Sequence, residues 1–186
     1  MAKVPPHAKK IFSGLLFNVY QWEQEMFDGS FKTFEMLWRV PTASVIATVG
    51  KKIITFDQQQ PGRSPYPSLP GGKVEPGESP EEAGRRELLE EAGYSIKDLA
   101  LFKLYNEHSK IDYDDYVFLA KNCVQTSKQN LDPGEKIKVK LVTFDQFLQL
   151  VRNPDTAIPR GLQHEMWEAL LNKNKKTELK IRLGLV

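Results

Sequence analysis

The stretch between Ser79 and Gly93 constrains the fold most, because its residue types specify where a helix begins and where it ends. Ser79 is a preferred N-cap residue, Pro80 suits the first helical position, and Glu82 completes a capping box with Ser79. Gly93 is the residue type that most readily takes the left-handed conformation that ends a helix. The sequence therefore predicts a helix over residues 79–92.

Three carboxylates share one face of this predicted helix. Glu87, Glu90 and Glu91 stand at positions i, i+3 and i+4, which are neighbours on a helix surface. A solvated acidic face is the ordinary interpretation of such a pattern. However, Arg86 lies four residues before Glu90, and the tight turn at 69–72 can place backbone carbonyls beside the carboxylates. Carboxylate and carbonyl oxygens are the ligands that Mg²⁺ or Mn²⁺ prefers, so the pattern predicts a divalent-cation site.

Most of the remaining chain is predicted to form strands, because bulky residues alternate between turn signals. Segment 11–39 is expected to be β-structure that Asp28-Gly29-Ser30 folds into a hairpin. The other expected strands are 44–49, 53–57, 99–106, 113–121 and 136–143, and the other expected helices are 145–151 and 163–172. Segment 58–70 contains four prolines and is expected to be a loop. Strands that do not alternate regularly with helices indicate an α+β fold, with a mixed sheet flanked by helices.

The composition excludes several classes of protein. The 186 residues include 26 Lys and Arg against 24 Asp and Glu, and this balance makes a nucleic-acid partner an unexpected one. No segment reaches the roughly 18 apolar residues of a membrane span. We find no signal peptide and expect a cytoplasmic protein with no membrane partner. The single Cys123 excludes an internal disulfide and is expected to be a small buried hydrophobe.

The two ends of the chain carry little sequence signal of structure. Residues 1–10 are rich in Pro and Lys and are expected to fray. The basic residues between Lys173 and Arg182 are expected to form a solvated terminus.

Segment 72–94, which reads GKVEPGESPEEAGRRELLEEAGY, resembles the Nudix box. That motif is G-x5-E-x7-R-E-U-x-E-E-x-G-U, where U is a bulky aliphatic residue. Tyr94 departs from it, being aromatic where an aliphatic residue is usual. The positions that match are Gly72, Glu78, Arg86, Glu87, Leu88, Glu90, Glu91 and Gly93.

This resemblance implies the Nudix fold, in which a mixed β-sheet is sandwiched between helices. It also implies Mg²⁺- or Mn²⁺-dependent hydrolysis of a nucleoside diphosphate that is linked to another group, X. Arg86 would orient the carboxylates through ion pairs, and Glu78 would be largely structural. Metal ions neutralise phosphate charge and lower the pKa of bound water, so the implied chemistry is consistent with these residue types. The implied metal ligands are the Gly72 carbonyl and the carboxylates of Glu87, Glu90 and Glu91, and the implied catalytic residues are Arg86, Glu90 and Glu91.

The resemblance extends to the ADP-ribose and nucleoside-diphosphate-sugar pyrophosphatases, which carry a β-rich segment ahead of the Nudix domain. We therefore expect residues 1–40 to be a β-rich extension that forms a homodimer, and residues 41–186 to be a Nudix domain with a C-terminal helix. Members of this subgroup use an acidic loop residue to position the catalytic water. Glu135 is the catalytic candidate here, and an acid in a surface turn is the alternative. The chain lacks the proline that the subgroup usually carries after the box.

Further candidates stand outside the box. Arg63 can bind a phosphate, and the alternative is an exposed loop arginine. Arg39 and Tyr66 are the other substrate-binding candidates, although aromatic residues at strand spacing are more often part of the core. His108 is a weaker candidate for a general base.

Several functions stay open at this stage. ADP-ribose or a sugar nucleotide is the first expected substrate. A nucleoside triphosphate or a dinucleoside polyphosphate is the alternative for an enzyme. A non-catalytic nucleotide-binding Nudix module is the alternative to an enzyme.

Overall fold

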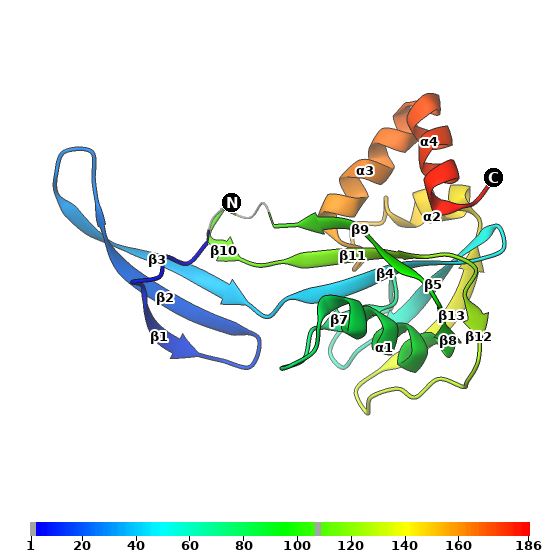
Figure 1. Cartoon of the computed structure of the whole chain (residues 1–186), viewed down its shortest axis with the longest axis horizontal. Coiled ribbons are helices and arrows are strands. Elements are labelled where there is room, and N and C mark those ends of the chain that lie inside the picture. The colour runs from blue at the N-terminus through cyan, green and yellow to red at the C-terminus, as the bar shows by residue number, and fades with distance from the viewer. Residues whose placement is uncertain (1–2, 107–108) are drawn as a thin grey trace.

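The structure, a computed structural model, describes residues 3–106 and 109–186. A mixed β-sheet lies between helices, and a second, smaller sheet extends to one side (Figure 1). The larger sheet contains β4 (Thr42–Val49), β5 (Lys52–Gln59), β6 (Tyr66–Ser68), β7 (Gly71–Lys73), β9 (Leu99–Tyr105), β11 (Asp115–Ala120) and β13 (Lys136–Val142). The smaller sheet contains β1 (Lys9–Ser13), β2 (Phe17–Glu25), β3 (Phe31–Arg39) and β10 (Ile111–Asp112). The helices are α1 (Pro80–Ala92), α2 (Phe144–Leu150), α3 (Arg160–Leu171) and α4 (Lys173–Leu183), and β8 (Tyr94–Ser95) pairs with β12 (Val124–Gln125).

The central strands run in the order β13-β5-β4-β11-β9. β11 pairs with β4 in parallel, whereas the other pairs in this path are antiparallel. The short strands β6 and β7 pair with β5 and β4 respectively. This mixed sheet with flanking helices confirms the predicted α+β class.

Neighbouring side chains of the central strands enter two separate cores. Val45 and Ile54 belong to the core beneath α1, whereas Ile46 and Ile53 belong to the core beneath α2, α3 and α4. Successive residues of a strand point to opposite faces of the sheet, so an apolar run fits a strand that is covered on both faces. Figure 1 shows α1 on one side of the sheet and α2–α4 on the other. Among the helices that the structure describes, none is both long and apolar enough to cross a membrane.

Helix α1 has the ends that the sequence predicts. The Ser79 side chain accepts a hydrogen bond from the Glu82 amide, and the Glu82 carboxylate accepts one from the Ser79 amide. Gly93 ends the helix in the left-handed conformation, with φ of 74°. Cys123 is buried as predicted, and burial raises the pKa of its thiol to about 11.

The N-terminal hairpin forms where the sequence predicts it. Strands β2 and β3 pair along their whole length, and the Asp28 carboxylate accepts hydrogen bonds from the Ser30 amide and hydroxyl in the turn between them. This sheet projects away from the main body of the molecule in Figure 1. Several of its large apolar side chains are exposed, namely Ile11, Phe12, Leu15, Leu16, Phe27 and Phe31.

The expectation of a frayed N-terminus is wrong for the residues that the structure describes. Strand β1 already begins at Lys9. The ammonium group of Lys3 lies 2.8 Å from the Asp112 carboxylate, and the Val4 amide donates to the same carboxylate at 3.0 Å. Segment 3–10 is therefore tied to β10 by contacts that are distant in sequence.

The expected loop at 58–70 contains strand structure. β5 continues to Gln59, and β6 pairs with β5 despite Pro67. Proline is tolerated there because β6 pairs with one neighbouring strand only, so the missing amide costs no ladder hydrogen bond.

The basic C-terminus is a packed helix rather than a solvated tail. In α4, Leu179 and Leu183 are buried in the core shared with α2 and α3. Lys176 forms an ion pair with Asp145 at 2.7 Å, and Arg182 donates to the Phe102 carbonyl at 2.7 Å. The basic side chains therefore hold the helix against the domain.

Substitution of Leu183 by alanine tests this packing. Leu183 is 0% exposed, so we expect Leu183→Ala to lower the free energy of unfolding by about 2–5 kcal/mol, as cavities in packed cores do. Ile181 on the same helix is 58% exposed, and Ile181→Ala is the matched control, with an expected loss of under about 1 kcal/mol. Urea denaturation measures both. Equal, small losses would contradict a packed C-terminal helix.

Candidate active site

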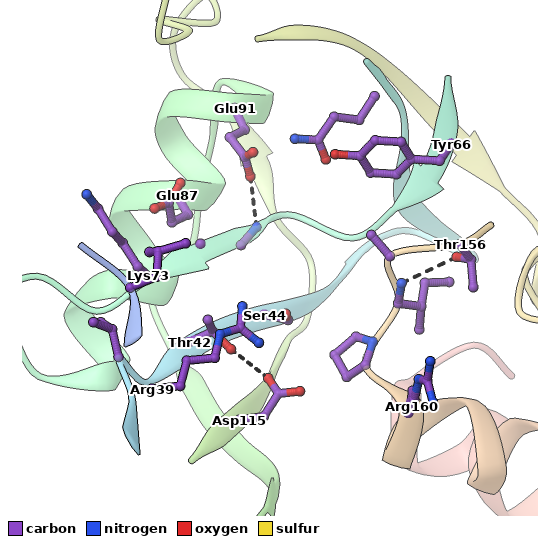
Figure 2. A pocket seen from close by; sticks show the side chains of 18 of the residues that line it. Arg39, Thr42, Ser44, Tyr66, Lys73, Glu87, Glu91, Asp115, Thr156 and Arg160 are labelled. Carbon is purple, nitrogen blue, oxygen red and sulfur yellow. Dashed lines mark hydrogen bonds between the residues drawn. The ribbon is translucent and has the colours of Figure 1, made fainter. Parts of the chain in front are cut away.

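A cleft of about 1070 Å³ lies between α1, the smaller sheet and the start of α3. Figure 2 shows Glu87 and Glu91 on one wall, contributed by α1, and Arg160 from α3 on the other. The strands β4, β6 and β7 contribute the residues between these two walls. The cleft is large enough for a nucleotide with a second group attached, because pockets for such ligands range from about 300 to 1,000 Å³.

Two adjacent glycines let β7 approach both β4 and α1. Gly71 has φ of 153°, and a Cβ atom there would overlap the Ala43 carbonyl of β4. A Cβ atom on Gly72 would overlap the Glu87 carboxylate. The Gly71 amide donates a hydrogen bond to Glu91 at 2.8 Å. The predicted turn therefore places peptide groups directly against two of the predicted carboxylate ligands.

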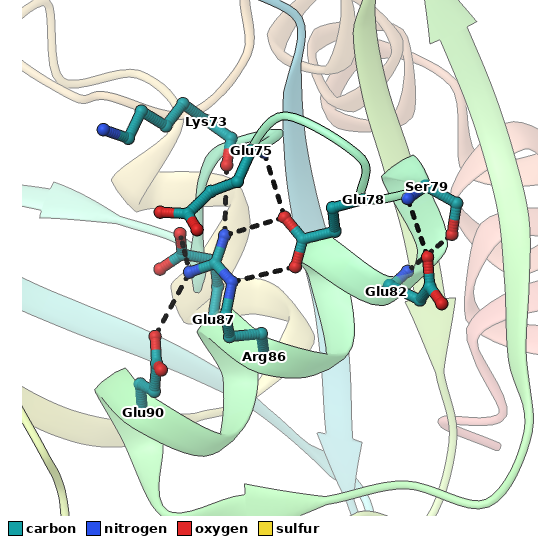
Figure 3. A network of polar contacts seen from close by, with 8 residues as sticks. All are labelled: Lys73, Glu75, Glu78, Ser79, Glu82, Arg86, Glu87 and Glu90. Carbon is teal, nitrogen blue, oxygen red and sulfur yellow. Dashed lines mark hydrogen bonds and ion pairs between the residues drawn. The ribbon is translucent and has the colours of Figure 1, made fainter.

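Arg86 links the acidic residues into one network, which Figure 3 shows. Its Nε donates to Glu78 at 2.9 Å, and its Nη1 donates to Glu87 at 2.8 Å and to Glu90 at 3.2 Å. Its Nη2 donates to Glu78 and to the Lys73 carbonyl. These ion pairs raise the pKa of Arg86, with the hydrogen bond to Glu78 as the largest cause. The guanidinium therefore fixes β7, the loop before α1 and the acidic face of α1 relative to one another.

For the buried carboxylates of the cleft, nearby positive charge and hydrogen bonds do not offset the effect of burial on the pKa. Burial raises the pKa of Glu91 to about 9, although the Gly71 amide opposes this shift. Burial also raises the pKa of Glu87, against the effect of Arg86. The charges of neighbouring carboxylates, including Glu135, raise both values further. Partly desolvated carboxylates are the type of ligand that a divalent cation takes, and such an ion would offset their negative charge.

The three predicted carboxylate ligands of α1 do not point to one common position. Glu87 and Glu90 point to Arg86, whereas Glu91 accepts the Gly71 amide. In the part of the chain that the structure describes, no three His, Cys, Asp or Glu side chains are grouped closely enough to hold a metal ion. The donor set of Gly72, Glu87, Glu90 and Glu91 fits a hard cation by its chemistry, and its role as a ligand set stays a prediction.

The structure brings Glu135 and Tyr66 into the same cleft but places Arg63 outside its lining. Burial raises the pKa of Glu135, and burial also raises the pKa of Tyr66. The Arg63 guanidinium lies 3.4 Å from the centre of the Tyr66 ring, and it donates to the Asp155 carbonyl at 3.0 Å. Arg63 thus supports Tyr66 and joins two loops. Direct contact between Arg63 and substrate stays a prediction.

Arg39 lies at the end of the cleft that the smaller sheet forms. Its guanidinium lies 4.4 Å from the centre of the Tyr113 ring and 5.8 Å from that of Phe17. Thr42 hydrogen-bonds to Tyr113 and donates to Asp115 at 2.9 Å on the floor of the cleft. The candidate base His108 lies outside the described residues.

Sequence reasoning missed several residues of the cleft. All but one come from segments that carry no motif, and the last three belong to α3: Thr42, Ser44, Lys73, Thr156, Arg160, His164 and Trp167. Of these, Lys73 alone lies within the box, so its position was the one available signal.

The ion pair between Glu78 and Arg86 predicts a dependence of stability on pH. Hydrogen bonds from Arg86 hold the pKa of Glu78 below the usual range of a glutamate side chain. A carboxyl group whose pKa is lower in the folded state stabilises the fold above its unfolded-state pKa. This stabilisation is lost as the pH falls through the folded-state pKa. Glu78→Gln should therefore lower the free energy of unfolding by about 1 kcal/mol at pH 7. The two proteins should become equally stable at a pH below the folded-state pKa of Glu78, as measured by urea denaturation. A difference that does not change with pH would contradict the ion pair.

Comparisons with known proteins agree with this geometry. The family model of the NUDIX domain matches residues 38–161. The chain is 32% identical over 149 residues to the ADP-ribose pyrophosphatase of Bacillus subtilis (strain 168), covering 78% of this chain and 80% of that protein. It is 27% identical over 175 residues to the methanol dehydrogenase activator of Bacillus methanolicus, covering 89% of this chain and 94% of that protein.

A solved structure shares the fold over nearly the whole chain. The crystal structure of an ADP compounds hydrolase superposes with a TM-score of 0.73 at 19% identity, covering 97% of this chain and 95% of that chain. The box residues surround the cleft in the structure, and the family model spans most of the chain. The chain therefore belongs to the Nudix hydrolase family.

Proposed function

We propose that this protein hydrolyses the pyrophosphate bond of a nucleoside diphosphate linked to X, and that ADP-ribose or a sugar nucleotide is its substrate. It is an enzyme of the Nudix family that acts on phosphoric anhydrides. The observation that carries the substrate proposal is the cleft, which is lined by the acidic face of α1 and also by residues of the smaller sheet and of α3. The similarity to a protein named ADP-ribose pyrophosphatase over 80% of that protein's length supports the same choice.

The chain's own residues supply a scaffold for the reaction. Glu87, Glu90 and Glu91, with the Gly72 carbonyl, would hold Mg²⁺ or Mn²⁺. The bound ion would neutralise charge on the pyrophosphate and lower the pKa of a bound water. Arg86 holds the side chains of Glu87 and Glu90 in the cleft through its Nη1 atom.

A proton acceptor is also available in the cleft. Glu135 lines the cleft, and its charge interacts with Glu87 and Glu91. We propose that it accepts the proton of the attacking water, a role that a carboxylate can take when it lies within hydrogen-bond reach of that water. The products would be a nucleoside monophosphate and phosphorylated X.

A substrate screen tests the proposal directly. Folded protein is incubated with ADP-ribose, sugar nucleotides, dinucleoside polyphosphates and nucleoside triphosphates, and the nucleoside monophosphate that forms is measured by anion-exchange chromatography. Each reaction is repeated with EDTA. We expect turnover of ADP-ribose or a sugar nucleotide that EDTA abolishes. Turnover of triphosphates alone would overturn the substrate proposal, and a silent panel would favour the non-catalytic nucleotide-binding module.

Glu91→Gln tests the role of the most buried carboxylate. Glutamine has the same shape as glutamate, and its amide oxygen can still accept the hydrogen bond from the Gly71 amide, so this substitution should preserve the fold. Loss of a charge that acts on the transition state should lower kcat by about 100-fold or more. Steady-state kinetics and thermal unfolding measure the two effects.

The matched control for this substitution is Glu81→Gln on the same helix. Glu81 is exposed, pairs with Arg85, and does not line the cleft. We expect its kinetics to equal those of the wild type. Wild-type turnover by Glu91→Gln would contradict the metal-ligand proposal.

We also propose that the enzyme is a homodimer that pairs through the smaller sheet. The exposed apolar side chains of that sheet support this choice, because contiguous apolar patches on a protein surface mark interaction sites. Leu15 is 99% exposed and Phe12 is 58% exposed, at the same end of the β1–β2 hairpin.

The double substitution Phe12→Glu and Leu15→Glu tests the dimer. Burying two carboxylates in an apolar interface is costly, so we expect the mass by light scattering to fall from dimer to monomer. Leu171→Glu on α3, which is 91% exposed and lies outside this sheet, is the control and should stay dimeric. A wild-type protein that is monomeric at all concentrations would contradict the proposal.

A further inference from the structure

The first turns of α3 form the wall of the cleft opposite the carboxylates. Figure 2 shows Arg160 at the start of this helix, across the cleft from Glu87 and Glu91, with Arg39 toward the other end. His164 and Trp167 follow Arg160 on the same helix and line the same cleft. Residues at i, i+4 and i+7 share one helix face, so these three side chains form one continuous surface.

Two of these residues are aromatic, and their rings stack on each other in the cleft wall. The rings of His164 and Trp167 stack with centroids 5.5 Å apart and an angle of 14° between their planes. The indole nitrogen of Trp167 donates to the Val151 carbonyl at 3.3 Å, which fixes the orientation of the ring. Trp167 is nevertheless 44% exposed. An oriented aromatic ring that stays open to a cleft is ready to cover the apolar face of a ligand ring.

Arg160 adds uncommitted hydrogen-bond donors to this surface. Within the described part of the chain, its guanidinium has no hydrogen-bond or ion-pair partner, in contrast to Arg86. A guanidinium carries five N–H donors and suits hydroxyl and phosphate oxygens. The ring of Trp167 and the free donors of Arg160 therefore lie on the same wall of the cleft.

We propose that Arg160, His164 and Trp167 form the subsite for the sugar ring of X, and that they select substrates whose X carries such a ring. A furanose or pyranose ring has an apolar face of C–H groups and a rim of hydroxyls, which match Trp167 and Arg160 respectively. This inference rests on the proposed function, in which the carboxylates of α1 mark the position of the pyrophosphate. To that proposed function, the inference adds the end of the cleft that receives X and the residues that recognise X.

The opposite end suits the nucleoside. Arg39 lies over Tyr113 and Phe17 there, and a guanidinium plane held among aromatic rings can stack on a base. A nucleoside triphosphate has no ring beyond its β-phosphate, so it would leave the α3 wall uncovered. The α3 wall should therefore contribute to binding of ADP-ribose and not to binding of a triphosphate.

Product inhibition of ADP-ribose hydrolysis separates the two ends. AMP occupies the nucleoside end, and ribose 5-phosphate occupies the X end. For Trp167→Ala we expect the inhibition constant of ribose 5-phosphate to rise by about tenfold, because a stacking face is lost, and that of AMP to stay within about twofold. Arg160→Ala should also raise the inhibition constant of ribose 5-phosphate and leave that of AMP unchanged. Trp167→Phe keeps a flat ring and should restore most of the affinity.

Leu171→Ala is the matched control, since Leu171 is 91% exposed on the same helix and does not line the cleft. Thermal unfolding of each variant shows that it is folded. Unchanged constants for both products, or a change confined to AMP, would overturn this inference while the proposed function stands. Absence of wild-type turnover of any ring-bearing derivative would overturn the proposed function, and this inference with it.

Discussion

The Arg86 guanidinium is the charge on which the order of the site depends. It contacts Glu78 in the loop before α1, Glu87 and Glu90 on the helix, and the Lys73 carbonyl of β7. Like charges at helical spacing repel one another, and burial penalises each of them further. A planar, permanently charged group with five donors can satisfy all of these acceptors at once, which an ammonium group cannot do in one fixed geometry.

The same network joins the catalytic chemistry to the core of the domain. Gly71 in β7 packs against β4, and its amide reaches Glu91 on α1. β4 is at the same time the central strand that separates the two apolar cores. A side chain at Gly71 or Gly72 would push β7 away from one of these neighbours. Packing and function therefore depend on the same close approach of backbone to helix.

Sequence reasoning succeeded where the determining interactions are local. The caps of α1 and the hairpin at Asp28 are set by residues within a few positions of one another, and both formed as predicted. It failed where distant contacts decide. α4 carries many lysines, yet Leu179 and Leu183 find a core that only the tertiary fold creates. The α3 wall carries no motif, and only the folded chain brings Arg160 and Trp167 into the cleft opposite the box.

The distribution of charge in the cleft supports the proposal of a bound cation. The centre of the cleft is lined by the acidic residues Glu87, Glu90 and Glu91, and burial raises the pKa of Glu87 and Glu91 because it disfavours their charged forms. Arg39 and Arg160 stand at the two ends, and Arg86 is already engaged by carboxylates. Coulomb energies fall with distance and are screened at exposed positions, so cations at the ends cannot balance the charge at the centre. In the proposed function, an ion held at the centre would offset this charge, and the arginines at the ends would orient the two groups that the pyrophosphate joins.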